Sequence, residues 1–324
     1  MPSEFDIINR YFAQTNLIPP ASDKTVLLGI GDDCALLQPN SDKALAFSID
    51  TLVEGVHFLV DMDAFLVGYR ALMVNISDLA AMGATPAYFT LALTLPWSDE
   101  QWLNDFAQGL SAVAQMHSIF LIGGDTTRGP LSITIQVVGQ VSPTHALKRS
   151  GAKVGDAIYV TGTLGDAAAG LQIIQEEIAC DESAANYLAN RFYQPSARVN
   201  MGQSLVEVAN SAIDISDGLL ADLAHILKAS EVGARVHIDA MPLSSELLSV
   251  VDKKTAQQLA LTAGDDYELC FTAAPDVEEK LKEVSQKTGV AITRIGEITN
   301  DKSLTCVDSD NNEIEFTTLG FRHF

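Results

Sequence analysis

Positive charge is scarce in this 324-residue chain, which carries 20 lysines and arginines against 42 aspartates and glutamates, a formal net charge of −22. Nucleic acids and anionic membrane surfaces repel such an acidic chain, so we expect neither as a partner. No apolar run reaches the ~20 residues of a membrane helix, and the start, Met1-Pro2-Ser3-Glu4, lacks a signal-peptide core. A cytoplasmic location is therefore expected.

Cysteine pairs and the familiar nucleotide-binding loops are also missing. The cysteines Cys34, Cys180, Cys270 and Cys306 are widely spaced without a Cys-x-x-Cys pair, which argues against a zinc site or a redox motif. The chain has no Gly-x-x-x-x-Gly-Lys-Ser/Thr loop, no dinucleotide fingerprint and no protein-kinase signature. If the chain binds a nucleotide, metal ions, glycine-rich turns and a few arginines must hold it.

The length and the periodicity indicate two domains. Hydrophobic residues make up 47% and charged residues 19%, a normal globular mixture. A polar, glycine-bearing stretch at 148–156 suggests a boundary near 141–143, which divides the chain into domains 1–142 and 143–324. The helical segments that we expect in the first half are 3–14, 63–82 and 99–117. The expected strands there are 26–30, 44–49, 87–95, 119–122 and 131–141. Strand 157–161 and a glycine turn at 162–165 open the second half, so the fold class is α/β or α+β.

Aspartates recur where apolar runs end. Such runs stop at Asp32-Asp33, Asp50, Asp125, Asp214 and Asp265-Asp266, while Asp78 lies within a helical pattern. A strand end followed by glycine lets a ligand approach the backbone closely, although any single aspartate there is more often a turn or cap residue. Converging carboxylates repel one another unless cations lie between them, and oxygen-only ligands favour Mg²⁺. The pattern therefore predicts a site for several magnesium ions.

Seven segments carry a resemblance to a known family. They are Gly29-Ile30-Gly31-Asp32-Asp33-Cys34-Ala35, Asp50-Thr51-Leu52-Val53-Glu54-Gly55-Val56-His57-Phe58, Asn75-Ile76-Ser77-Asp78-Leu79-Ala80-Ala81-Met82-Gly83-Ala84, Gly123-Gly124-Asp125-Thr126-Thr127-Arg128-Gly129, Arg149-Ser150-Gly151-Ala152, Asp214-Ile215-Ser216-Asp217-Gly218-Leu219 and Gly264-Asp265-Asp266-Tyr267-Glu268-Leu269. In this order they resemble the thiamine-monophosphate kinase family, of the superfamily of aminoimidazole-ribonucleotide synthetase and selenophosphate synthetase. The stretch from Cys180 to Ala197 matches nothing in that pattern.

The resemblance implies a fold, a reaction and a set of site residues. The N-terminal α/β domain would bind metal and ATP and form a homodimer through a β-barrel-like sheet, and the C-terminal α/β domain would complete the nucleotide and substrate site. The reaction would transfer phosphate from ATP to thiamine monophosphate, giving thiamine diphosphate and ADP. The implied metal ligands are Asp33, Ser48, Ile49 through its carbonyl, Asp50, Asp78, Asp125, Asp214 and Asp217. The implied nucleotide contacts are Gly124, Asp125, Arg149 and Ser216. The implied substrate contacts are His57, Asp265 and Phe321.

The mechanism that we expect is direct in-line phosphoryl transfer. Magnesium held by Asp33, Asp50, Asp78, Asp125 and Asp214 would neutralise the two approaching anions, with Asp50, Asp125 and Asp214 as the catalytic core. The acceptor phosphate is already ionised at neutral pH, so no general base is needed. Three assignments stay open from the sequence. His57 either contacts the acceptor or is a partly buried histidine in a loop, and Arg128 either contacts the nucleotide or forms an ion pair at the surface. The turn 162–166 either cradles a phosphate or is a plain turn.

Two other functions remain open from the sequence. One is an ATP-dependent ligase or cyclase of the same superfamily, such as aminoimidazole-ribonucleotide synthetase; the lack of an N-terminal catalytic cysteine argues against selenophosphate synthesis. The other is a catalytically silent protein that binds divalent cations. ADP release that depends on thiamine monophosphate distinguishes the kinase from both.

Overall fold

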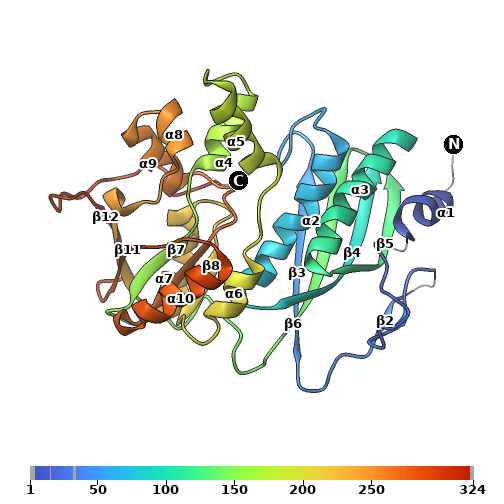
Figure 1. The fold of residues 1–324 in the computed structure, drawn as a ribbon, viewed down its shortest axis with the longest axis horizontal. Coiled ribbons are helices and arrows are strands. Elements are labelled where there is room, and N and C mark those ends of the chain that lie inside the picture. Colours follow the sequence, from blue (N-terminus) through green and yellow to red (C-terminus); the bar gives the residue numbers. More distant parts are fainter. Residues whose placement is uncertain (1–3, 15, 32–33, 322–324) are drawn as a thin grey trace. The chain divides into compact units, whose positions relative to one another are not determined.

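The structure, a computed structural model, describes residues 4–14, 16–31 and 34–321 and divides into two compact units (Figure 1). Unit 1 comprises 1–79 and 84–144, and unit 2 comprises 80–83 and 145–324. The short segment 80–83 belongs with unit 2 although it directly follows the main part of a helix of unit 1. The two-domain α/β architecture predicted from the sequence is confirmed.

Unit 1 is built on a four-stranded sheet with the strand order β3-β6-β4-β5. Strands β3 and β4 both pair antiparallel with β6, and β5 pairs parallel with β4. The elements of this part of the chain are α1 (Glu4–Ile7), η1 (Ile8–Phe12), β1 (Val26–Leu28), β2 (Leu36–Leu37), β3 (Ala44–Val53), α2 (Ala64–Ala81), β4 (Thr85–Leu95), α3 (Glu100–His117), β5 (Phe120–Arg128) and β6 (Ser132–Val141).

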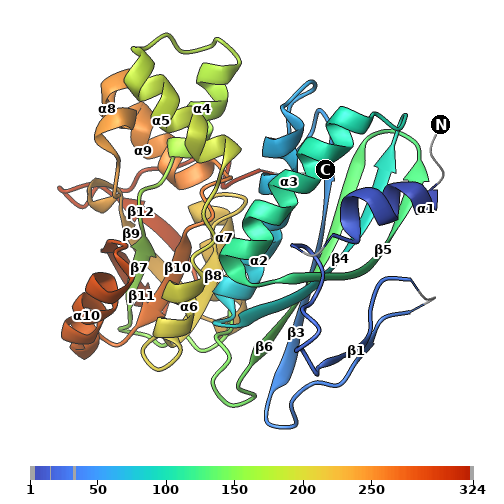
Figure 2. The ribbon, with the colours of Figure 1, turned by 45° about the vertical axis from the view of Figure 1, so that its right-hand side comes forward.

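Helices α2 and α3 lie side by side along one face of this sheet (Figure 2). They approach closely because glycines face each other's backbone: a Cβ at Gly68 would lie 2.2 Å from the Phe106 carbonyl oxygen, and one at Gly109 would lie 2.0 Å from that of Phe65. Contrary to the expectation from the sequence, helix α2 is long and apolar enough to cross a membrane by length and composition alone. However, 78% of it is buried inside the structure, as in the core helix of a folded domain.

The opposite face of the sheet is only partly covered. Tyr88 and Val138 are buried there beneath the β1–β2 hairpin, which contributes Val26 and Leu37. Beyond the hairpin, β3 presents Phe47 and Ile49 with exposed fractions of 58% and 60%. Unit 1 therefore carries an apolar strip on the edge strand of its sheet.

Unit 2 contains a six-stranded mixed sheet with the order β12-β9-β11-β7-β10-β8. Its elements are β7 (Ala157–Thr161), α4 (Asp166–Ile174), α5 (Glu182–Tyr193), α6 (Val199–Leu205), β8 (Ser211–Asp214), α7 (Leu219–Ser230), β9 (Gly233–His237), η2 (Ile238–Ala240), α8 (Ser245–Val250), α9 (Lys253–Thr262), β10 (Leu269–Ala273), η3 (Pro275–Val277), α10 (Glu278–Thr288), β11 (Ile292–Thr299) and β12 (Leu304–Val307).

Both faces of the second sheet are packed, so its central strands are buried along their whole length. All five residues of β7 and all five of β10 are buried. Alternate residues of β7 reach opposite cores: Ile158 packs in the core that includes α7, whereas Tyr159 stacks on Phe271 in the core that includes α6 and α10. A third cluster joins α4, α5, α8 and α9.

Candidate active site

The loop that follows β8 holds three of the predicted site residues. Asp214 is the last residue of β8 and only 5% exposed, and Ser216 and Asp217 come directly after it. The Oδ2 atom of Asp222, in the first turn of α7, accepts hydrogen bonds from the N–H groups of Ser216, Asp217 and Gly218 at 3.0, 3.1 and 3.2 Å. One carboxylate oxygen thus fixes the backbone of the whole loop.

Asp222 is a residue that the sequence analysis missed. Burial raises the pKa of this carboxyl to about 7, and the three N–H donors act against that rise by stabilising the charged form. The signal that was available is an acidic residue in the first turn after a glycine, a position where a carboxylate satisfies otherwise unpaired N–H groups.

The segment that precedes β10 lies against the loop after β8. The N–H of Asp265 donates to the Ser216 carbonyl at 2.9 Å, and the N–H of Tyr267 donates to the Ile215 carbonyl at 2.8 Å. Asp265 and Tyr267 have left-handed backbones, with φ of 73° and 50°, and the Tyr267 hydroxyl donates to Asp265 Oδ1 at 3.2 Å. Residues assigned to ATP and to the acceptor are therefore joined by a direct hydrogen bond.

The C-terminal segment adds a fifth predicted residue to the same place. The N–H of Phe321 donates to the Asp217 carbonyl at 2.9 Å, and the N–H of Ala221 donates to the Leu319 carbonyl at 3.0 Å. The Phe321 side chain is 49% exposed. Unit 2 thus gathers five predicted residues from three segments that are distant in the sequence: Asp214, Ser216, Asp217, Asp265 and Phe321.

A second cluster joins β3 to α2 in unit 1. The Ser48 hydroxyl donates to Asp78 Oδ2, and the N–H of Asp50 donates to Asn75 Oδ1 at 3.1 Å. Asn75 is fully buried and its amide donates to the Ala71 carbonyl at 2.8 Å, so its orientation is fixed within the helix. Four predicted metal ligands lie in this cluster: Ser48, Ile49, Asp50 and Asp78.

His57 is oriented by the end of the same strand. Its Nδ1 accepts the N–H of Val53 at 3.0 Å, and Arg70 Nε donates to the His57 carbonyl at 3.3 Å. Since Nδ1 accepts a hydrogen bond, the neutral ring carries its proton on Nε2. The ring is therefore prepared to act as a donor through Nε2.

These two clusters can be compared with known proteins. Residues 31–141 match the family model "AIR synthase related protein, N-terminal domain", and residues 153–309 match the corresponding C-terminal domain. Thiamine-monophosphate kinase of Escherichia coli strain K12 is 49% identical over 323 residues, which cover 99% of this chain and 98% of the relative.

The chain belongs to the thiamine-monophosphate kinase family. The crystal structure of the family member from Stenotrophomonas maltophilia K279a superimposes with a TM-score of 0.85 at 45% identity, covering 90% of this chain and 93% of that one. The structure of AaThiL complexed with AMPPCP and TMP superimposes with a TM-score of 0.78 at 30% identity, covering 89% of each chain.

Other residues that the family resemblance implied are not brought together. Asp50 pairs with Ile135, Ile135 with Leu91, and Leu91 with Gly124, so Asp50 and the residue before Asp125 lie in one row across the sheet. Strands β3 and β5 are its opposite edges, about 14 Å apart at the usual strand spacing. Among the described residues no three histidine, cysteine, aspartate or glutamate side chains form a metal-binding group, and Asp33 lies outside those residues.

Three aspartates do not follow strands in the way that the sequence predicted. Asp50 and Asp125 lie inside β3 and β5, and Asp265 follows helix α9 rather than a strand. On an edge strand an aspartate can reach solvent, so Asp50 does not end β3. Gly124 does not end β5 either, because a Cβ there would lie 2.0 Å from the Leu91 carbonyl oxygen and glycine permits this close pairing.

Arg128 and Arg149, the two arginines that the sequence suggested as nucleotide contacts, lie on different units. Arg128 is exposed, and its Nε donates to the Pro96 carbonyl at 3.2 Å. Arg149 is also exposed; its loop is held by Ser230, whose Oγ accepts the N–H groups of Gly151 and Ala152 at 3.1 Å each. Ser230 ends α7, whereas the loop after β8 precedes that helix, so the two sites lie roughly 17 Å apart along its axis.

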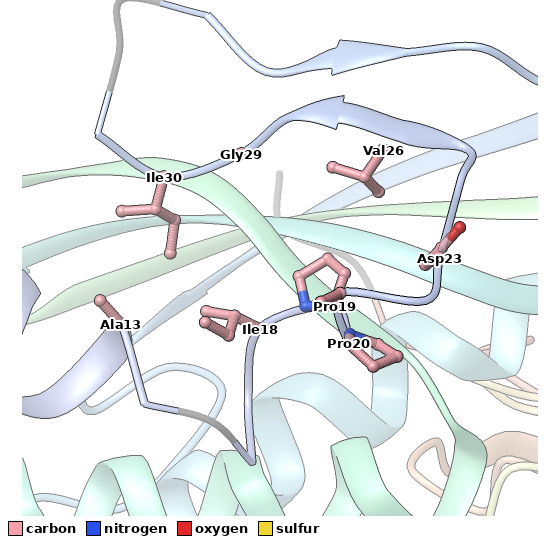
Figure 3. A pocket seen from close by; sticks show the side chains of 9 residues that line it. Ala13, Ile18, Pro19, Pro20, Asp23, Val26, Gly29 and Ile30 are labelled. Carbon is pink, nitrogen blue, oxygen red and sulfur yellow. The ribbon is translucent and has the colours of Figure 1, made fainter.

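A pocket of about 270 Å³ lies elsewhere on unit 1 (Figure 3). Its walls are mainly apolar, with Ile18, Pro19, Val26 and Ile30 among them, and Asp23 at the rim. Asp23 Oδ2 accepts the Tyr88 hydroxyl at 2.7 Å. None of the predicted site residues lines this pocket, so it is not the candidate active site.

Proposed function

We propose that this chain transfers the γ-phosphate of ATP to thiamine monophosphate and releases thiamine diphosphate and ADP. Membership of the thiamine-monophosphate kinase family supports this reaction, as does the related AaThiL structure with AMPPCP and TMP. The observation that carries the proposal in this chain is the hydrogen bond from the Asp265 N–H to the Ser216 carbonyl. It puts a residue assigned to the acceptor beside one assigned to ATP, as direct transfer requires.

Magnesium is the metal that suits the donor groups. Ser48 and Asp78 in one cluster, and Asp214 and Asp217 in the other, offer only oxygen atoms, which Mg²⁺ prefers. Bound Mg²⁺ would neutralise phosphate charge during transfer. The residues that would hold it are Asp33, Ser48, Ile49 through its carbonyl, Asp50, Asp78, Asp125, Asp214 and Asp217.

The remaining residues would bind and orient the two substrates. His57, with its proton on Nε2, would donate a hydrogen bond to the acceptor phosphate. Asp265 would contact the acceptor, and the half-exposed ring of Phe321 would cover its heterocycle. Gly124, Arg149 and Ser216 would contact the nucleotide. The ionised acceptor oxygen attacks phosphorus directly, so none of these residues serves as a general base.

The proposal includes a homodimer formed through the sheet of unit 1. Phe47 and Ile49 expose an apolar strip at the β3 edge, which a second copy would cover. Light scattering at micromolar concentration should then give twice the chain mass of 34.7 kDa; a monomer there contradicts this part of the proposal.

The reaction is tested by ADP release with ATP and Mg²⁺, with and without thiamine monophosphate. Release that needs the acceptor supports the kinase. Release without it, or nucleotide binding without turnover, contradicts the proposal and favours a different superfamily reaction or a silent cation-binding protein. A cytoplasmic location stays a prediction.

The metal assignment is tested by Asp50→Asn and Asp125→Asn. Each variant loses a charged oxygen ligand, so turnover should fall by orders of magnitude while the thermal melt stays cooperative. The matched control is Asp42→Asn, an equally conservative change at an exposed residue just before β3, which should leave turnover unchanged. Turnover near the wild-type value at saturating Mg²⁺ in either of the first two variants refutes the assignment.

A further inference from the structure

A buried carboxylate, Glu268, lies three residues after Asp265 in the segment that precedes β10. Glu268 is completely buried, and both of its carboxylate oxygens accept hydrogen bonds from other side chains. Arg198 donates through Nε at 2.6 Å and through Nη2, and Arg191 donates through Nη2 at 3.1 Å. The Thr161 hydroxyl donates a further bond at 2.7 Å. Two guanidinium groups therefore converge on one glutamate.

The ion pairs continue to a second buried carboxylate at the start of α4. Arg191 Nε lies 3.7 Å from Asp166 Oδ2, and Asp166 is completely buried. The hydroxyls of Thr163 and Ser244 donate to Asp166 at 2.5 and 2.6 Å. Arg191 thus bridges helix α4 to Glu268 beneath the loop that precedes β10.

The third carboxylate of the network is Asp266, which is 1% exposed. Its Oδ2 accepts the N–H of Gly165 at 2.8 Å, at the N-terminus of α4. From the sequence, the turn before α4 could cradle a phosphate or be a plain turn. In the structure its Gly165 N–H binds a carboxylate of the chain itself. Another glycine of that turn is also required: a Cβ at Gly162 would lie 2.2 Å from Glu268 Oε1.

Buried and partly exposed residues alternate from Asp265 to Glu268, which links the buried network to the surface of the candidate site. Asp266 and Glu268 are buried, whereas the residues that precede them, Asp265 and Tyr267, are partly exposed and have left-handed backbones. A left-handed backbone is tolerated by aspartate but is unfavourable for a bulky residue such as tyrosine, so surrounding contacts must hold Tyr267. The two buried carboxylates are the anchors on either side of Tyr267, and Asp265 directly precedes the first of them.

The network holds one more carboxylate than guanidinium groups. Three carboxylates, Asp166, Asp266 and Glu268, face two guanidinium groups. Burial raises the pKa of Asp266 well above its usual value, although the Gly165 N–H and Arg191 act against the rise. Removing either arginine would leave Glu268 with a single guanidinium partner, and removing Arg191 would also take the ion-pair partner of Asp166. Buried charges tolerate such a loss of compensation poorly.

We propose that Arg191 and Arg198 are positioning residues for the phosphate acceptor: through Glu268 they hold residues 264–268 in the conformation that presents Asp265. Arg191 comes from α5, within the segment 180–197, which matches nothing in the family pattern. The inference rests on the proposed function, because it takes Asp265 as an acceptor contact.

The test compares Arg191→Met with Arg191→Lys and with a control, Arg235→Met. Methionine keeps most of the apolar stem and removes the charge, and lysine keeps the charge but loses the planar fork. Arg235 is an arginine of the same unit whose pair with Glu297 is solvent-exposed, at 3.7 Å. For Arg191→Met we expect the KM for thiamine monophosphate to rise at least tenfold, with less than a threefold change in the KM for ATP. Arg191→Lys should recover part of the loss, and Arg235→Met should match the wild type.

Hydrogen exchange supplies a readout that does not depend on activity. The amides of Asp265 and Tyr267 are hydrogen-bonded to the loop after β8, so a peptide covering 264–268 should exchange slowly in the wild type. In Arg191→Met that peptide should exchange at least tenfold faster, while peptides from β7 and β10 keep their protection. If Arg191→Met does not fold, the same two measurements on Arg191→Lys decide, with smaller changes in the same direction.

Two results would overturn the inference. One is an unchanged KM for the acceptor together with unchanged exchange at 264–268 in a folded Arg191 variant. The other is an equal loss for ATP and acceptor with faster exchange throughout unit 2, since that indicates general destabilisation. A wild-type protein that never uses thiamine monophosphate refutes the proposed function instead, and the exchange measurement still tests whether Arg191 holds the segment.

Discussion

Replacing Asp222 with alanine should loosen the loop after β8 and weaken the binding of both substrates. The structure gives three N–H groups that depend on this one carboxylate, at 3.0 to 3.2 Å. An unsatisfied buried donor costs about 1–3 kcal/mol. Ser216 and Asp217 are partly exposed and can be hydrated again, whereas Gly218 is buried. We therefore expect a loss of about 1–3 kcal/mol in the free energy of unfolding, mainly from the buried N–H of Gly218.

The functional effect follows from what the loop supports. Asp265 and Phe321 both donate backbone hydrogen bonds to this loop, through the carbonyls of Ser216 and Asp217. In Asp222→Ala the KM for ATP should rise roughly tenfold, equivalent to about 1.4 kcal/mol, and the KM for thiamine monophosphate should rise with it. This joint effect distinguishes Asp222 from Arg191, for which we expect only the acceptor to be affected.

The assay combines thermal unfolding with steady-state kinetics of ADP release. The matched control is Asp252→Ala, which removes an aspartate whose Oδ1 accepts the N–H groups of Lys254 and Thr255 at the start of α9. Loss of that cap should cost about 1 kcal/mol and leave both KM values unchanged. If Asp222→Ala unfolds at the wild-type temperature and keeps both KM values, the carboxylate does not hold the loop and our reasoning is wrong.

Two further predictions concern unit 1. His57→Ala removes a donor to a phosphate, worth roughly 1.5–3 kcal/mol, so the KM for thiamine monophosphate should rise about ten- to a hundredfold while ATP affinity stays nearly constant; weaker ATP binding with an unchanged acceptor KM would reverse the substrate assignment. Burial and the hydrogen bond to Asp23 raise the pKa of Tyr88 to about 12, above its ordinary value of 10.0. The folded state therefore holds this proton more tightly, and stability should fall as pH rises from about 10 to about 12. Tyr88→Phe should reduce that fall in alkaline denaturation curves, and an unchanged slope would contradict the assignment.

Periodicity in the sequence identified most of the scaffold. The segment 63–82 was predicted as a helix and is α2 from Ala64 to Ala81, and the segment 157–161 was predicted as a strand and is β7 with the same bounds. Both segments bury continuous apolar surface, which composition reveals directly. The expected strands 44–49 and 119–122 were too short, because polar and glycine residues were taken as ends although pairing with β6 and β4 continues through them.

The supports of the candidate site could not be predicted in the same way. Ser216, Asp217 and Asp265 were found because they stand in motifs that resemble a family. Asp222 and Arg191 act through partners that only folding brings to them. Arg191 and its partner Glu268, for example, are far apart along the chain. No local periodicity encodes such contacts, so only the three-dimensional structure shows which charged residues are buried against others.

The distribution of arginine shows how an acidic chain divides its few positive charges. Arg191 and Arg198 have side chains that are only 14% and 19% exposed, and both are paired with Glu268. Arg149, which was assigned to the nucleotide, is exposed on a loop that Ser230 holds. A buried carboxylate needs a positive partner, and Arg191 and Arg198 supply it to Glu268 close to the proposed acceptor residues. These two arginines are therefore not available to bind a ligand. In the proposed function the acceptor would be contacted by Asp265 and His57, and the positive charge that its phosphate needs would come from bound metal ions. The arginines and the metal ions therefore have separate tasks: the former fix the loop, and the latter would neutralise the substrates.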